Sequence, residues 1–89
     1  MDVDELLAYI EQNLKEDISL VDLAQVVHYS PRQIYYTIKE ATGMPVMSYI
    51  RYRRLIKAAA EIGQGRKLFD VAMDYGFDTQ VGFYKAFLL

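Results

Sequence analysis

Apolar residues along the first half of the chain recur every three or four positions, which is the spacing of amphipathic helices. The first set predicts a helix over residues 3–14 and comprises Val3, Leu6, Leu7, Ile10 and Leu14. The second predicts a short helix after Ser19 and comprises Leu20, Leu23, Ala24 and Val27. A third helix carries Ile34 and Ile38 and is expected to stop at Gly43.

Two helix-start signals support these assignments. Ser19 is followed three residues later by Asp22, and Ser30 by Gln33, so each serine can cap free amides while the later side chain bonds back. Pro31 takes the first helical position after Ser30. Only His28 and Tyr29 then separate the second and third helices, and the lone His28 is interpreted as a turn residue rather than a ligand.

The second half of the chain predicts a longer helix followed by two short ones. The long helix spans residues 46–62 and ends at Gly63 and Gly65. Its expected buried side consists of Leu55, Ala58, Ala59 and Ile62. The next apolar stripe consists of Leu68, Val71, Ala72 and Tyr75, and a last helix, capped by Thr79, carries Phe83 and Phe87. Because no strand-like alternation occurs, the fold class is all-α.

An internal repeat organises these helices. Leu20, Asp22, Leu23 and Ala24 recur in the second half as Leu68, Asp70, Val71 and Ala72, and the turn residue Tyr29 recurs as Phe77. Each copy reads as a short helix, a tight turn and a capped helix, which is the plan of a helix-turn-helix. We therefore expect one domain over residues 1–89 with a first unit at 1–43, a connecting helix at 44–63 and a second, incomplete unit at 64–89.

Composition narrows the possible functions. The 89 residues contain no cysteine and one histidine, so disulfides, a thiolate zinc site and a histidine-based triad are excluded, and no enzyme and no cofactor are expected. No run approaches the roughly 20 apolar residues of a membrane-spanning helix, and the acidic start differs from a secretory signal. We expect a cytoplasmic protein without a membrane partner.

The net charge of -2 hides an asymmetry. Up to Ser30 there are seven acidic residues and one basic residue, whereas from Pro31 onward nine basic residues face five acidic ones. Such a distribution fits one surface that meets phosphate and another that faces away from it, although a charge imbalance is also typical of a solvated face.

The second helix of a helix-turn-helix turns its apolar positions to the core and the positions between them to base edges. With Ile34, Ile38, Phe83 and Phe87 inward, the outward positions become the candidate contacts with double-stranded DNA. The candidate base readers are Arg32, Tyr35, Tyr36, Gln80, Val81, Tyr84 and Lys85. Arg32 suits guanine, Gln80 adenine and Val81 a thymine methyl. The tyrosines are equally compatible with plain surface.

Basic residues near helix ends suit phosphate, which applies to Lys39 and also to Lys85. The connecting helix adds the candidate phosphate ligands Arg51 and Arg53. Solvation of an exposed helix face is the competing interpretation of this arginine-rich segment. Arg54, next to the buried positions, is interpreted as a structural ion-pair partner.

The order of these landmarks resembles the DNA-binding domain of AraC/XylS-type transcription regulators. The matching segments are SLVDLA at 19–24, SPR at 30–32, KEATG at 39–43, Tyr49 with Ile50, Arg54 with Leu55 and Ala58, and 71–77 leading to Phe83 and Phe87. The resemblance implies seven helices, two recognition helices in successive major grooves, and regulation of transcription. It assigns base reading to Arg32, Tyr35, Tyr36, Gln80, Val81, Tyr84 and Lys85, with RNA polymerase as the expected partner of the full-length regulator.

Three departures from the family pattern concern the second unit. Lys67 replaces a helix-capping serine or threonine, Gly82 lies inside the last helix, and the chain stops at Leu89 before the family's final helix. The apolar tail at Leu88 and Leu89 predicts self-association through this end. The main alternative function is a helical protein-interaction module that does not read DNA.

Overall fold

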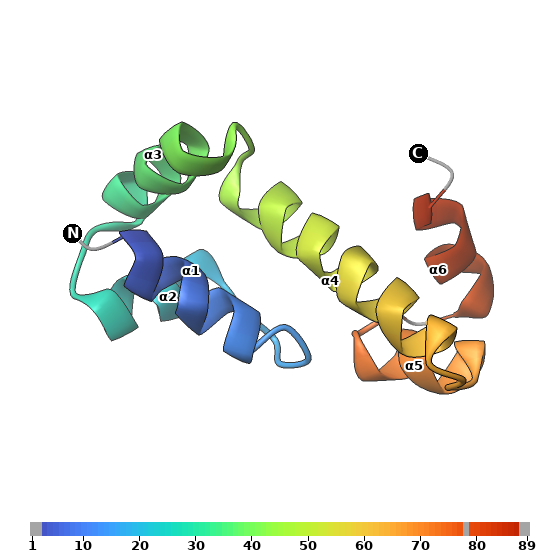
Figure 1. Ribbon diagram of the computed structural model, residues 1–89. Helices are drawn as coiled ribbons and strands as arrows, with labels where there is room; N and C mark the ends of the chain where they lie inside the picture. The colour runs from blue at the N-terminus through green and yellow to red at the C-terminus, as the bar shows by residue number, and fades with distance from the viewer. Residues whose placement is uncertain (1–2, 78, 88–89) are drawn as a thin grey trace.

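The computed structural model of the chain describes residues 3–77 and 79–87, and of Gln80 and Phe87 it describes the backbone alone. The helices of the described residues are α1 (Val3–Gln12), α2 (Leu20–Val27), α3 (Pro31–Thr42), α4 (Val46–Gly63), α5 (Leu68–Asp74) and α6 (Gln80–Phe87). No strand occurs in these ranges. The predicted all-α fold, with two helix-turn-helix units joined by a long connecting helix, is confirmed (Figure 1).

Capping boxes begin both helices of the first helix-turn-helix, as predicted. The Ser19 hydroxyl accepts from the Asp22 amide at 3.1 Å while the Ser19 amide donates to the Asp22 carboxylate at 3.3 Å. Ser30 and Gln33 form the same reciprocal pair at 3.2 and 2.9 Å. Because each box satisfies amides that a helix start leaves free, α2 and α3 begin at defined residues.

Left-handed residues end these two helices. His28 follows α2 with φ 60°, and Gly43 follows α3 with φ 76°. Glycine adopts this conformation without steric cost, whereas histidine adopts it at a cost, so the sharp turn between α2 and α3 is held by its surroundings. The interpretation of His28 as a turn residue is confirmed.

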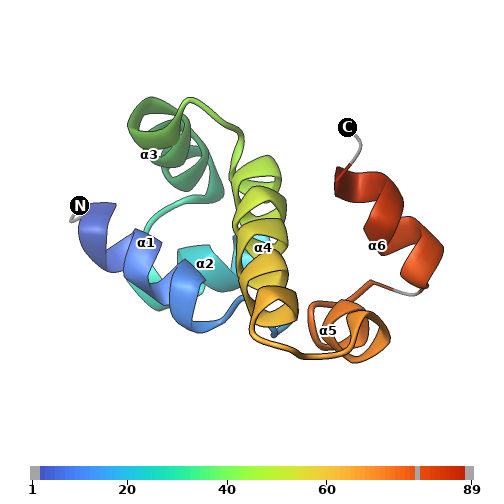
Figure 2. The ribbon, with the colours of Figure 1, turned by 45° about the vertical axis from the view of Figure 1, so that its right-hand side comes forward.

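The 18 residues of α4 make it about 27 Å long at a helical rise of about 1.5 Å per residue. Figure 1 and Figure 2 both show α1, α2 and α3 around one end of α4 and α5 and α6 at the other. The molecule is accordingly elongated, with extents of 38 × 22 × 21 Å. The connecting helix therefore sets how far apart the two units lie.

One continuous apolar core links both units through α4, and it runs from Leu6 and Ile10 in α1 to Phe83 in α6. On α4 it includes Val46, Ile50 and Ala58. The sequence prediction had placed Ala59 on the buried side, which is wrong: Ala59 is exposed and lies about half a turn around the helix from the buried Ile50.

Leu68 is a second correction to the predicted core. It was predicted in the buried stripe of α5, but its exposed fraction is 36%. Leu68 is the first residue of a helix of only seven residues, whereas Val71 and Ala72 reach the core from its last turn and Tyr75 from the residue that follows it.

Arg54 fastens the turn after α1 to the connecting helix. Its Nε donates to the Leu14 carbonyl at 2.8 Å and its Nη2 donates to the Glu16 carbonyl at 2.7 Å. Arg54 therefore has a structural role, but the expected ion pair is not found among the described residues, because its bonded partners are backbone carbonyls. Burial lowers the pKa of Arg54, and the two carbonyls compensate part of that desolvation.

Candidate nucleic-acid interface

The outer face of α3 carries the cations predicted for the first recognition helix. Ile34 and Ile38 are fully buried, and this orientation turns Arg32, Tyr36 and Lys39 outward as exposed side chains. Tyr36 is 57% exposed, whereas Tyr35 is half-buried. The helix therefore separates an apolar inner face from an outer face of cations and aromatic rings.

Arginine, lysine and tyrosine alternate on this outer face in contact with one another. The Arg32 guanidinium lies 5.7 Å from the Tyr36 ring centre, and the Lys39 ammonium lies 6.0 Å from that of Tyr35. The two rings meet edge to face, with centres 5.4 Å apart. Such cation–π contacts reduce the freedom of long side chains before a ligand arrives. Arg32 and Tyr36 also line a shallow surface hollow with Tyr29, Gln33 and Thr37.

The second candidate helix, α6, is positioned by a threonine cap and an aromatic contact. The Thr79 hydroxyl accepts from the Gly82 amide at 2.9 Å, as predicted for a cap. Phe83 is fully buried, and its ring centre lies 5.0 Å from that of Phe77. These contacts hold the helix by its start and by its inner face.

The opposite face of α6 is exposed. Val81 is 62% exposed, Tyr84 59%, and Lys85 is exposed near the last turn. The side chains of Gln80 and Phe87 and the whole of Leu88 and Leu89 lie outside the described residues. The predicted base contact by Gln80 and the predicted apolar tail therefore stay predictions.

The cations of the connecting helix divide into two groups. Arg51 is exposed, and the structure gives it no salt bridge within the described part of the chain. Arg53 donates to Glu11 of α1, with Nε at 2.5 Å from Oε1 and Nη2 at 3.3 Å from Oε2, and Lys57 lies 3.7 Å from the same carboxylate. The Arg53 hydrogen bond lowers the pKa of Glu11. Arg53 therefore joins α4 to α1, which the sequence could not indicate because the two residues lie 42 positions apart.

The two candidate helices lie near opposite ends of the connecting helix. In Figure 1 and in Figure 2, α3 lies at the top of the view beside the start of α4, and α6 lies above α5 near the other end of α4. Two helices with exposed outer faces, held apart by a helix of about 27 Å, are compatible with a reader of successive major grooves, which repeat every 34–36 Å or so.

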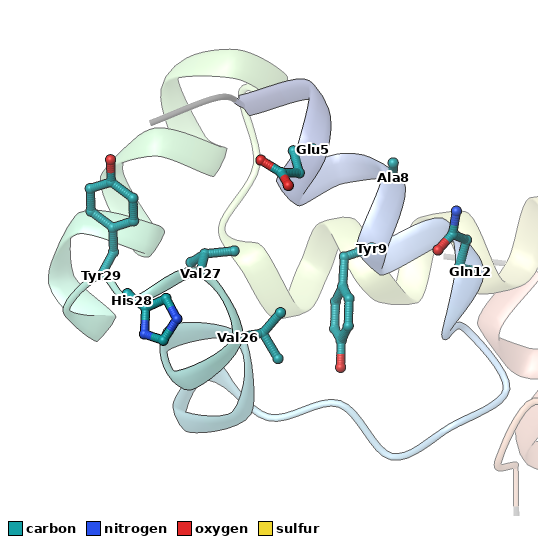
Figure 3. A pocket seen from close by; sticks show the side chains of 8 residues that line it. All are labelled: Glu5, Ala8, Tyr9, Gln12, Val26, Val27, His28 and Tyr29. Atoms are coloured by element: carbon teal, nitrogen blue, oxygen red, sulfur yellow. The ribbon is translucent and has the colours of Figure 1, made fainter.

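Another hollow lies away from α3's outer face, between α1 and the end of α2. It is lined by Glu5, Ala8, Tyr9, Gln12, Val26, Val27, His28 and Tyr29, and Figure 3 shows Tyr9 pointing from α1 beside Val26. Within the described ranges, no three histidine or acidic side chains are grouped so as to hold a metal ion. None of the described helices is long and apolar enough to cross a membrane.

The helix-turn-helix domain family matches residues 23–88 of the chain. Over 86 residues the chain is 37% identical to the transcriptional activator AarP of Providencia stuartii, covering 96% of this chain and 64% of AarP. It is 36% identical over 84 residues to the right origin-binding protein of Escherichia coli, covering 93% of this chain and 29% of that protein. The chain thus spans less than two thirds of these curated relatives.

Solved structures agree on the fold. The C-terminal domain of the response regulator AraT from Geobacillus stearothermophilus superposes with a TM-score of 0.82 at 25% identity, covering 98% of this chain and 77% of that one. The C-terminal domain of the response regulator yesN from Fusobacterium nucleatum gives the same TM-score at 21% identity, covering 96% and 90%.

Proposed function

Because this chain belongs to the AraC-type helix-turn-helix family, we propose that it binds double-stranded DNA sequence-specifically through α3 and α6 and thereby regulates transcription. Duplex DNA offers two successive major grooves on one face, and each groove admits one helix. The observation that carries the proposal is the pair of exposed outer faces on α3 and α6, which lie near the two ends of α4.

In this proposal, the first unit supplies most of the charge-assisted contacts. Arg32 reads guanine from the exposed start of α3, with Tyr35 and Tyr36 beside it, and Lys39 contacts phosphate. Arg51, exposed on α4, is a further phosphate ligand. Arg53 is not one of the proposed phosphate ligands, because its guanidinium already donates two hydrogen bonds to the Glu11 carboxylate.

The second unit presents a more apolar outer face. Val81 is suited to a thymine methyl, and Tyr84 and Lys85 reach bases or phosphate from the following turn. Gln80 keeps its proposed role as an adenine reader at the start of α6. Base selection by this unit would therefore depend more on apolar and uncharged polar contacts than on charged side chains.

The protein would act by binding and not by catalysis, in the cytoplasm where duplex DNA is its ligand. RNA polymerase is the proposed partner of the full-length regulator. Support for a regulatory role comes from the relatives, of which AarP is named a transcriptional activator. Self-association through the end of the chain is a separate proposal, tested by sedimentation of this chain over a range of concentrations.

Selection of binding sites from a random duplex pool tests the proposal, followed by titration of the selected duplex at several salt concentrations. We expect an enriched motif with two half-sites and an affinity that falls steeply as salt rises, because bound phosphates release counterions. A pool without enrichment and an affinity that salt does not change would contradict the proposal. The helical protein-interaction module would then be the better explanation.

A further inference from the structure

Charged side chains from both units meet at the far end of α4. Lys15 lies in the turn after α1, Glu61 in the last turn of α4, Arg66 in the loop before α5, and Asp74 and Tyr75 at the end of α5. These five residues are called the junction cluster below. Lys15 is its one member from the first unit.

We propose that Lys15, through the junction cluster, fixes the position of the second unit relative to the first and thereby determines the spacing of DNA half-sites that the protein accepts. The spacing part of this inference rests on the proposed function. The fixing of the two units does not.

The contacts of the cluster alternate in charge. The Lys15 ammonium lies 3.2 Å from Glu61 Oε1 and 3.8 Å from Asp74 Oδ2. The Arg66 guanidinium lies 2.8 and 2.7 Å from the same two oxygens. Two cations therefore share two carboxylates, and removal of Lys15 leaves two anions facing a single arginine.

Tyr75 is the buried member of the junction cluster and supports the charged side chains from below. Its side chain is 6% exposed, its hydroxyl donates to the second oxygen of Glu61, and the Lys15 ammonium lies 5.2 Å from its ring centre. An isolated exposed ion pair contributes little, but a network supported by a buried ring and a cation–π contact holds its members in one geometry.

The backbone that carries Lys15 is itself fixed. Arg54 donates to the carbonyls of Leu14 and Glu16, the two neighbours of Lys15, so the turn is fastened to the middle of α4. Lys15 reaches from this fastened turn to the end of α5. The first unit therefore contacts the second directly, beside the covalent link through α4.

Movement of α5 would be passed on to α6. Phe77, just after α5, packs on Phe83 of α6, so the candidate recognition helix follows the helix that Lys15 holds. Each extra base pair between half-sites shifts the second groove by about 3.4 Å and rotates it by about 36°. A fixed α5 accepts one such arrangement, whereas a loosened α5 accepts several.

The first experiment measures the separation of the units without DNA. Because the chain has no cysteine, Glu40→Cys on α3 and Asp70→Cys on α5 place two spin labels at exposed positions. We expect a narrow distance distribution for this labelled chain and one at least about twice as wide with Lys15→Glu added, since the new carboxylate repels Glu61 and Asp74.

Lys57→Glu is the matched control. Lys57 is 48% exposed against 47% for Lys15, carries the same charge, and pairs with Glu11 instead of with the second unit. Its distance distribution should stay narrow. The double variant Lys15→Glu with Asp74→Lys restores a pair of opposite polarity and should narrow the distribution again.

The second experiment measures spacing preference on the selected duplex and on duplexes with one or two base pairs inserted or removed between the half-sites. The parent chain should lose about tenfold or more in affinity at one base pair from its optimum, and Lys15→Glu less than about threefold. Lys57→Glu should keep the parent's ratio of affinities between the optimal and the shifted spacing, even if its overall affinity changes.

Either experiment can overturn the inference. An unchanged distance distribution in Lys15→Glu would show that the cluster does not fix the units. A wider distribution with the parent's spacing preference would show that the cluster does not set spacing. If the parent bound no duplex at all, the proposed function and the role of Lys15 in spacing would both be wrong. The spin-label distances would still decide whether Lys15 holds the two units together.

Discussion

The two helix-turn-helix units repeat the same core positions but differ in how their helices begin. In the first unit, Ser19 and Ser30 each form a complete capping box. In the second, Thr79 caps α6, but Lys67 stands at the start of α5 without a side-chain cap, and Gly82 lies inside α6. The start of a helix is stabilised by nearby residues, whereas its buried face is stabilised by packing against other helices. A duplicated core can therefore persist while one copy loses a side-chain cap. We therefore expect the second unit to open at lower free energy than the first.

The largest expected effect is the loss of the Phe83 side chain. Phe83→Ala removes the fully buried ring that fastens α6 to Phe77 and should lower the free energy of unfolding by about 3–5 kcal/mol. Urea unfolding measures the loss. Amide exchange should show α5 and α6 opening first, with α2 and α3 still protected; uniform loss of protection would mean that the two units unfold together.

Next in size is the difference between base and phosphate contacts on α3. Arg32→Ala should cost about 1–3 kcal/mol of DNA affinity and relax preference at one base pair, whereas Lys39→Ala should weaken all sequences evenly. Competition binding on a panel of single-base variants compares the two. Equal loss across the panel for both substitutions would remove Arg32 from the base readers.

The missing cap of α5 can be restored. Lys67→Ser places a serine three residues before Asp70, as Ser19 stands before Asp22, and should raise the free energy of unfolding by about 0.5–1 kcal/mol. Lys67→Ala removes the same charge without adding a cap and should give no gain. If both variants behaved alike in urea unfolding, the weak start of α5 would not be a capping defect.

Capping was predictable because it depends on residues three positions apart, and both boxes and the Thr79 cap were correctly read from the sequence. The buried face of α4 was not, since apolar residues occur on several sides of this helix and only the packing of neighbouring helices decides which of them are covered. The ionic contacts of Glu11 and Lys15 join segments about 40 residues apart or more. No local pattern could indicate them, and Arg53 was therefore assigned to phosphate.

Acidification should weaken the junction between the units. The hydrogen bonds from Tyr75 and Arg66 lower the pKa of Glu61 to about 2 from its ordinary 4.5. The folded state thus favours the carboxylate, so this stabilisation is fully present above about pH 4.5 and is lost as the pH falls toward 2. Urea unfolding between pH 5 and pH 2, roughly the range where linkage acts, should show a smaller loss for Glu61→Gln than for the parent. A parallel pH dependence of the two proteins would exclude Glu61 as a contributor.

The smallest effect concerns Gly82. An added Cβ would raise helix propensity by about 1 kcal/mol but would lie 3.2 Å from the Thr79 Oγ1 that caps the helix. Gly82→Ala alone should therefore change the free energy of unfolding by less than about 0.5 kcal/mol, and in a Thr79→Ala background it should recover most of the propensity gain. Additive effects in this double-mutant cycle would show that the cap and the Cβ do not conflict.

DNA reading by both recognition helices is tested most directly by NMR. The measurement follows amide and side-chain chemical shifts while the chain is titrated with its selected duplex. We expect the largest chemical-shift changes on two separate groups, with α1 and α2 little affected. The first group is Arg32, Tyr36 and Lys39 of α3, and the second is Val81, Tyr84 and Lys85 of α6. Changes confined to α3 would show that the second unit does not read DNA. Changes centred on α1 and α2 would contradict the proposed interface as a whole.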